Sequence, residues 1–297
     1  MNRKILLFFA PLSIFGIFGQ AQTSLLDQVG KDADTTEYVK YSFKTNRVIN
    51  LHSLESTAEG VFDFKVSHRF QPVDEGFYNL FGLDGASQRF GGDYGITDNL
   101  TVTLNRNSYR KAVDLGLKYR FLRQSTGKRE MPITAAWFSS IACETQKYDN
   151  PDRLYYFSSR LFYVNQLIIG RKFNDYVTFE IVPTHVHRNL VPTAADKNDV
   201  FALGFGGRLR LSRRVTFNAE YVALLTNLSG GTYKNSMSIG MDIETGGHVF
   251  QLHFTNSASM AEYSFVTQNE TDFFAKNSIR FGFNISRVFT IYNPKKK

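Results

Sequence analysis

The sequence predicts an all-β protein, a transmembrane antiparallel β-barrel of about 12 strands that follows a cleaved signal peptide. Three observations predict this fold. The N-terminus has the composition of a secretory leader, most of the remaining chain alternates apolar and polar residues, and the connections between the alternating segments are short and long in turn.

The N-terminus has the layout of a signal peptide. Basic Arg3 and Lys4 precede an apolar stretch over residues 5–18, and the small residue Ala21 follows. This stretch is interrupted by Pro11 and is too short to span a bilayer comfortably as an anchor. We therefore expect export, with cleavage after Ala21.

The composition favours a membrane barrel and excludes several other classes. Aromatic residues make up 15% of the chain, which suits a lipid-facing band flanked by interfacial girdles. The single cysteine, Cys143, excludes an internal disulfide framework. Part of the net charge of +8 comes from the terminal residues 295–297, and no basic run is interleaved with aromatics, so we expect no nucleic-acid partner.

The mature chain contains a series of alternating segments. In AVDLGLKYRF, residues 112–121, one face carries Val113, Leu115 and Leu117, while the other carries Asp114 and Lys118. Other segments with this pattern are GVFDFKVSHRF, NLTVTLN, DVFALGFGGRLRLS, RVTFNAEYVA, NSMSIGMDIE, GGHVFQLHFTNS and SIRFGFNIS. Charge is frequent on the polar faces, so each segment predicts a strand with one apolar face.

Three segments depart from this alternation, of which MPITAAWFSSIA only alternates weakly. Asn165 and Gln166 are adjacent, so we expect either one polar group on the apolar face or a bulge that shifts the register. Pro183 lacks a ladder donor and is expected at a bulge or a strand end.

The connection lengths decide which face meets lipid. Short connections at ITDNL, KFNDYV, LSRRV and ETGGH alternate with long ones, as in outer-membrane barrels with periplasmic turns and outer loops. The expected organisation is a signal peptide at 1–21, a periplasmic segment at 22–59, a barrel at 60–290 and a basic tail at 291–297. Whether the segment 22–59 enters the lumen stays open.

A set of motifs between about residues 41 and 290 carries a resemblance to a known family. They are TNRVIN, FKVSHRF, LFGLDGAS, DYGITDNLTV, KYRFLRQSTG, VHRNLV, DKNDVFALGFGGRLRLS, SIGMDIETGGHVFQLHFTNS and FGFNISRVFT. In these motifs the chain resembles an uncharacterised family of outer-membrane β-barrel proteins from Bacteroidetes-type Gram-negative bacteria, a domain of unknown function. This resemblance implies a location and a fold, but no activity. The chain departs from the general outer-membrane pattern at IYNPKKK, because barrels often end on an aromatic residue.

Acidic and basic residues, together with a few other polar residues, are expected to face the lumen. They line either a narrow aqueous pore or a lumen closed by salt bridges. A basic ladder of Arg208 and Arg210 with Lys118 and Arg120 would favour anions. The expected lumen-facing residues are Asp63, Lys65, Asp93, Asp114, Lys118, Arg120, Glu180, Arg208, Arg210, Glu220, Asp242, Glu244, Gln251, His253 and Arg280.

Other motifs give weaker indications of function. His185 and His187 lie on one face of a strand at a spacing able to chelate a metal, but without a visible third ligand a polar surface girdle is favoured. Ser67 and His68 are adjacent and face opposite ways, so they do not form a hydrolase pair. The loop LFGLDGAS either folds into the lumen or caps the rim, and the last loop, from Ser257, is a candidate lid or ligand contact.

We expect a narrow channel or small-solute transporter without catalytic, metal or cofactor sites. A closed structural or assembly-linked barrel is the alternative, and a membrane-embedded hydrolase is the third. The expected partners are outer-membrane lipid, a small solute and the barrel-insertion machinery, which would read Phe281, Phe283 and Phe289.

Overall fold

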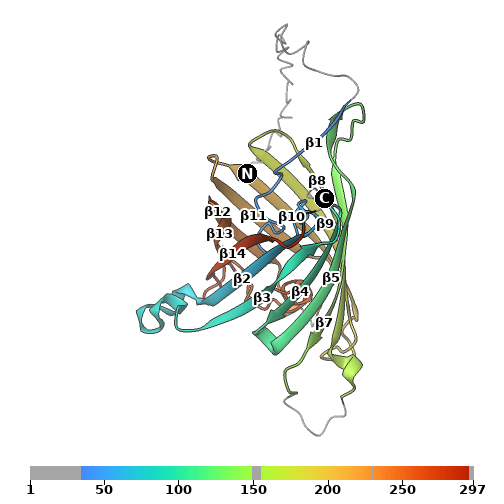
Figure 1. The fold of residues 1–297 in the computed structure, drawn as a ribbon. Helices are drawn as coiled ribbons and strands as arrows, with labels where there is room; N and C mark the ends of the chain where they lie inside the picture. Colours follow the sequence, from blue (N-terminus) through green and yellow to red (C-terminus); the bar gives the residue numbers. More distant parts are fainter. Residues whose placement is uncertain (1–34, 149–154, 229–230, 294–297) are drawn as a thin grey trace, which may run out of the picture.

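A computed structural model describes residues 35–148, 155–228 and 231–293, which form a closed barrel (Figure 1). Within these residues, twelve antiparallel strands follow one another around the wall, and β14 pairs with β2 to close it. The fold class predicted from the sequence is confirmed. The expected signal peptide, residues 1–21, and the last four residues of the tail lie outside the described residues.

The wall strands are eight to twelve residues long, which suits tilted strands that cross a bilayer. They are β2 (Val61–Pro72), β3 (Ala86–Gly95), β4 (Leu100–Asn107), β5 (Ala112–Leu122), β7 (Thr134–Glu144), β8 (Leu161–Lys172), β9 (Val177–Arg188), β10 (Asp199–Arg210), β11 (Val215–Leu224), β12 (Ser236–Thr245), β13 (His248–Thr255) and β14 (Arg280–Thr290). No helix among the described residues is both long and apolar enough to cross a membrane.

Burial alternates along the strands as their sequences predict. In β5, Asp114 and Lys118 are buried inside the barrel, while Leu115, Leu117 and Tyr119 are about half exposed on its outer surface. Because successive side chains of a strand point to opposite faces, the apolar row of β5 lies outside and its polar row inside.

Strand β8 accommodates the adjacent Asn165 and Gln166, and β9 accommodates Pro183, without a bulge. Gln166 faces inward and is fully buried, while Asn165 faces outward and accepts a hydrogen bond from the hydroxyl of Ser139 (2.8 Å). The expected bulge or strand end at Pro183 is wrong, because β9 continues through it with an unchanged register against β10. On its other side, β9 pairs with β8 except at Val182 and Pro183. This gap in the ladder accommodates the N–H group that proline lacks.

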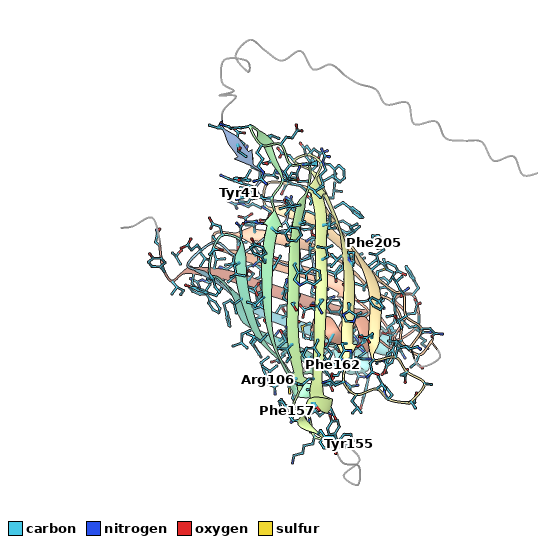
Figure 2. All side chains as sticks on the ribbon, turned by 90° about the vertical axis from the view of Figure 1, so that its right-hand side faces the viewer. Tyr41, Arg106, Tyr155, Phe157, Phe162 and Phe205 are labelled. Carbon is cyan, nitrogen blue, oxygen red and sulfur yellow. The ribbon has the colours of Figure 1, made fainter. Side chains whose placement is uncertain are left out.

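The two ends of the barrel differ. Strand β2 begins and strand β14 ends at one end of the barrel, where the short turns also lie. A small sheet of β1 (Thr36–Tyr38) and β6 (Ser125–Gly127) extends from this end. The opposite end carries the long loops; Figure 2 shows Tyr41 toward the first end and Phe157 toward the second.

Two segments enter the barrel from opposite ends. Residues 41–58, here the N-terminal plug, follow β1 and include Val48, Leu51 and His52, none of which is exposed. Residues 256–279, here the inner loop, connect β13 to β14 and carry the short helix α2 (Glu262–Thr267), which is wholly buried. The question left open by the sequence is thus answered, and the lumen is filled from both sides.

The apolar core lies inside the lumen. Side chains of the plug, among them Phe43 and Leu51, and of the inner loop, among them Phe265, pack in one cluster with inward residues of β7–β10 such as Phe138 and Val182. The filled lumen therefore has a conventional hydrophobic core on one side.

The first long loop does not enter the lumen. The two short 3-10 helices η1 (Val73–Glu75) and η2 (Phe77–Gly82) project away from the wall, and Phe77 and Tyr78 are largely exposed. Of the two alternatives left open for LFGLDGAS, folding inward as a constriction is excluded, because the plug and the inner loop already occupy that space.

Candidate functional site

The N-terminal plug turns back on itself in a tight hairpin. The backbone N–H of Val48 donates to the carbonyl of Leu51 (2.9 Å), with Ile49 and Asn50 at the tip. The N–H groups of Ile49, Asn50 and Leu51 face away from this bond and need an acceptor elsewhere.

Glu220 of β11 supplies that acceptor. Its carboxylate, which is almost fully buried, accepts hydrogen bonds from the N–H groups of Ile49 (3.1 Å), Asn50 (2.9 Å) and Leu51 (2.9 Å). The side-chain amide of Asn50 adds a fourth bond (2.8 Å). Successive N–H groups around one carboxylate form an anion-binding nest, so the wall holds the plug by its turn.

Glu262 of the inner loop contacts the base of the same hairpin. Its carboxylate forms an ion pair with Arg47, and Oε1 lies 3.1 Å from Nε2 of His52. Arg89 of β3 approaches the other carboxylate oxygen, with Nη2 at 3.4 Å. The hairpin thus lies between two carboxylates, one from the wall and one from the inner loop.

The wall extends this network. Arg89 pairs with Asp114 (2.7 Å), which also accepts a hydrogen bond from Asn105 (2.9 Å). These three side chains are almost fully buried. Plug, inner loop and wall therefore meet in one buried ionic cluster, where the loss of any charge leaves others without compensation.

A second charged group lies nearer the turn end. Lys65 of β2 pairs with Asp93 of β3 and lies 3.3 Å from Asp63. Asn46 of the plug donates to Asp93 (3.2 Å), and Ser286 of β14 donates to Asp63. The plug therefore interacts with the polar wall at two levels.

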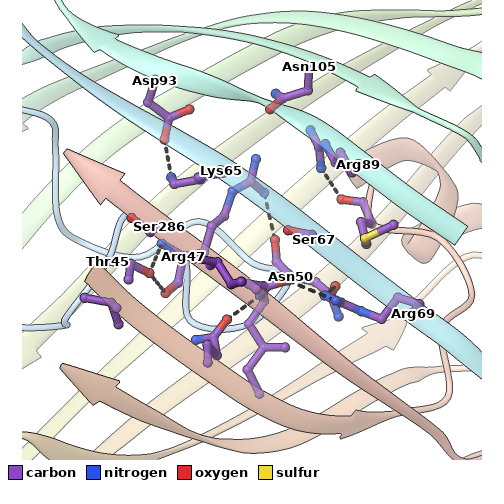
Figure 3. Close-up of a pocket in the computed structure, with 16 residues that line it drawn as sticks. Thr45, Arg47, Asn50, Lys65, Ser67, Arg69, Arg89, Asp93, Asn105 and Ser286 are labelled. Carbon is purple, nitrogen blue, oxygen red and sulfur yellow. Dashed lines mark hydrogen bonds and ion pairs between the residues drawn. The ribbon is translucent and has the colours of Figure 1, made fainter. Parts of the chain in front are cut away.

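A cavity of about 40 Å³ remains between the plug and strands β2, β3, β13 and β14 (Figure 3). It is lined by Arg47, Lys65 and the fully buried Arg69, whose guanidinium donates to Asn50 (2.8 Å) and Asn284 (2.9 Å). This volume holds a few water molecules, so the cavity is a polar remnant of the lumen.

The structure places most of the expected lumen-facing residues on the inner face. Lys65, Arg210 and Arg280 are partly exposed, and Glu244 is exposed at the turn end, where it pairs with Lys44 of the plug. The other residues of the set are at most 9% exposed, namely Asp63, Asp93, Asp114, Lys118, Arg120, Glu180, Arg208, Glu220, Asp242, Gln251 and His253.

Several of these groups contact the plug. Lys118 donates to the carbonyls of Ser53 and Glu55, and Arg208 donates to the carbonyl of Tyr41 (2.9 Å). The residues expected to form a basic ladder thus have separate partners, because the plug lies between the strands that carry them.

Sequence reasoning missed the residues that join the segments. Arg69 and Arg89 share a face with Lys65 and Asp93, so strict alternation would have found them. Arg47 and Glu262 lie outside the barrel strands, and no periodicity indicates that they are buried.

The remaining motifs lie outside this site. His185 and His187 face outward and share Oδ1 of Asp199, at 2.9 and 2.8 Å. Within the described ranges, no group of three or more His, Cys, Asp or Glu side chains is arranged to hold a metal ion. Ser67 lines the inner cavity, whereas His68 stacks with Phe283 on the outer surface.

Comparison with known proteins supports a membrane barrel. A family model described as "Membrane bound beta barrel domain (DUF5777)" matches residues 43–289, which include the plug hairpin and the twelve wall strands of the described chain except for the last residue of β14. No curated protein sequence matches the chain.

Several solved structures have a similar outline. The NanC porin is 9% identical, with 77% of this chain and 98% of the porin aligned and a TM-score of 0.49. The KdgM porin in complex with disordered oligogalacturonate is 8% identical, with 76% and 99% aligned and a TM-score of 0.49. An outer membrane channel from Pseudomonas putida F1 is 13% identical, with 80% and 98% aligned and a TM-score of 0.48. Similarities this low carry no information about activity.

Proposed function

Because the chain belongs to the family of membrane-bound β-barrel domains, we propose that it is a narrow channel or small-solute transporter of the outer membrane, closed at rest by the plug and the inner loop. The leader-like N-terminus supports export, and Phe281, Phe283 and Phe289 on the last strand supply apolar residues that the insertion machinery would read. A small solute would pass when both the plug and the inner loop leave the lumen.

The observation that carries this proposal is that the barrel is complete without the plug. Each wall strand pairs with two other wall strands, so removal of residues 41–58 leaves no open edge in the wall. The hairpin is held through side-chain acceptors, above all Glu220 and Glu262, and the groups freed on the polar wall can be hydrated by water.

Single-channel conductance in planar bilayers tests the proposal. The full-length protein should conduct rarely, while a variant lacking both the plug, residues 41–58, and residues 258–276 of the inner loop should give steady steps. A Glu262→Gln variant should open more often than the native protein because it weakens the contact with Arg47. Glu270→Gln, an exposed carboxylate in the same inner loop, is the matched control and should behave as native.

The alternative is a closed structural barrel with a salt-bridged lumen. The apolar cluster inside the lumen favours it, because withdrawal of Phe43 and Leu51 exposes apolar surface to water. Silence of the variant lacking residues 41–58 and 258–276, in preparations whose circular dichroism shows an intact barrel, would establish this alternative and exclude the channel. We propose no catalytic role, since Ser67 and His68 lie on opposite faces of the wall.

A further inference from the structure

The loop between β2 and β3 carries an unusual set of exposed apolar side chains. We call residues 73–85 the aromatic finger. The exposed fractions are 80% for Phe77, 94% for Tyr78, 54% for Phe81 and 47% for both Leu80 and Leu83. Apolar side chains scattered singly on a surface need no explanation, but a contiguous group of this size marks an interaction surface.

The backbone of the finger is held in a strained shape. Leu80 (φ 47°) and Phe81 (φ 53°) both adopt the left-handed conformation, which costs a bulky residue about 1–2 kcal/mol. The N–H of Phe81 donates to the carbonyl of Gly76 (2.8 Å), and Gly82 (φ +84°) lies directly against the backbone of Gln71. The shape is thus fixed by local contacts while the apolar side chains stay outside.

The base of the finger is attached to the rest of the molecule. The N–H of Val73 donates to the carbonyl of Ile279 (2.8 Å), and the N–H of Gln71 donates to the carbonyl of Gly85 (3.1 Å). Figure 1 shows the finger, in cyan, projecting sideways from the loop ends of β2 and β3, away from the lumen. Only its base contacts the inner loop, and its tip does not cover the lumen.

The finger continues an apolar surface that already faces lipid. On the outer wall beside it, Phe70 of β2 stacks with Phe281 of β14 at 5.8 Å between ring centroids and lies 6.1 Å from Phe283. From Phe77 to Leu83 the sequence contains no charged residue, whereas Asp74 and Asp84 flank this stretch. An uncharged aromatic tip on a polar base is the composition that membrane proteins place at the boundary between lipid tails and headgroups.

We propose that the aromatic finger inserts into the lipid interface beside the loop end of the barrel and anchors this end in the membrane. The bilayer is the occupant because the finger extends sideways from the lipid-facing wall and offers apolar area without charge. The chain itself leaves these apolar side chains exposed to water, and contact with lipid removes them from it.

Fluorescence depth quenching in the full-length protein tests this proposal. The single tryptophan, Trp137, is replaced by phenylalanine and Tyr78→Trp supplies the reporter. The protein is reconstituted in phosphatidylcholine vesicles, either plain or brominated on the acyl chains near the glycerol. We expect brominated lipid to quench the reporter at least twofold, and aqueous iodide to quench it only weakly.

The matched control is Phe157→Trp in the same background. Phe157 is 71% exposed and lies at the loop end of the barrel, along the axis rather than beside the wall (Figure 2). Its reporter should be quenched by iodide and not by brominated lipid. Both substitutions replace exposed aromatic residues, so the barrel should fold in each variant.

Two results would overturn the proposal. Equal iodide quenching at positions 78 and 157 would show that the finger lies in water. Shielding of position 78 from both quenchers would show that protein covers it, and loss of this shielding at high lipid-to-protein ratio would identify a second copy of the chain as the occupant. Neither outcome depends on channel activity.

Discussion

The inner wall of the barrel has two unlike halves. Strands β7–β10 supply most of the wall residues of the buried apolar cluster, such as Phe138, Val164 and Val200. Strands β2–β5 and β12–β14 present mainly polar and charged ones, such as Asp93 and Gln251. The plug lies between the two halves, with its apolar side toward the apolar half and its polar side toward the polar half.

The comparison shows how one short segment is held by two kinds of interaction. On the apolar side, the ring of His52 lies 3.8 Å from that of Phe138, and the side chain of Leu51 lies against Gly204. On the polar side, Asn46 and Asn50 bond to the wall. Apolar packing is non-directional, whereas hydrogen bonds require defined partners, so the polar half sets the position of the plug.

Removal of the Glu220 carboxylate should have the largest effect on the plug. In Glu220→Ala the N–H groups of Ile49, Asn50 and Leu51 lose their acceptor, which should weaken docking by about 3 kcal/mol or more. Maleimide labelling of Ser53→Cys in a Cys143→Ser background should become faster by at least tenfold, since Ser53 is fully buried. Unchanged labelling would show that the apolar half alone holds the plug.

Neutralisation of Glu262 should have the next largest effect, on the inner loop. Glu262→Gln leaves Arg47 and Arg89 with less compensating charge and should destabilise the contact by about 2–3 kcal/mol. Amide hydrogen exchange in α2 should accelerate, while Glu270→Gln should leave it unchanged. If exchange in α2 does not respond, the ionic cluster does not hold the inner loop.

A larger side chain in the apolar half should push the plug out by steric overlap. A Cβ at Gly204 would lie 3.1 Å from Leu51, so Gly204→Leu should cost about 1–3 kcal/mol. Trypsin should then cleave after Arg47 more rapidly. Gly207→Leu is the control: Gly207 faces outward, and the nearest atom to its Cβ is 3.9 Å away. Equal cleavage in the two variants would contradict close packing of Leu51 against Gly204.

The smallest effect is expected on the outer surface. His185→Ala removes one of the two imidazoles beside Asp199, which is largely exposed. Exposed ion pairs contribute less than about 1 kcal/mol, so the thermal unfolding midpoint should change by no more than a few degrees. A large destabilisation would reveal a structural role that this exposed position does not suggest.

Most of the barrel was predictable from the chain, whereas the contact between its internal segments was not. The period of two placed Asp114, Lys118 and Gln251 on the inner face, because side chains alternate along any strand. The same rule could not reveal Glu262, which lies in a loop and is buried only because that loop turns into the lumen. Pro183 was misjudged because its missing donor is accommodated locally in the ladder.

By itself, the sequence determined that this protein is a closed barrel with an apolar outer surface, since alternation and backbone pairing depend on local geometry and on the absence of water in the lipid. Only the tertiary structure decided what fills the barrel. Residues 41–58 have no strong pattern of their own, and their burial depends on the width of the lumen and on two carboxylates far away in the chain. The width of the lumen and the positions of these carboxylates are set by the assembled barrel, and no short segment of the sequence encodes them.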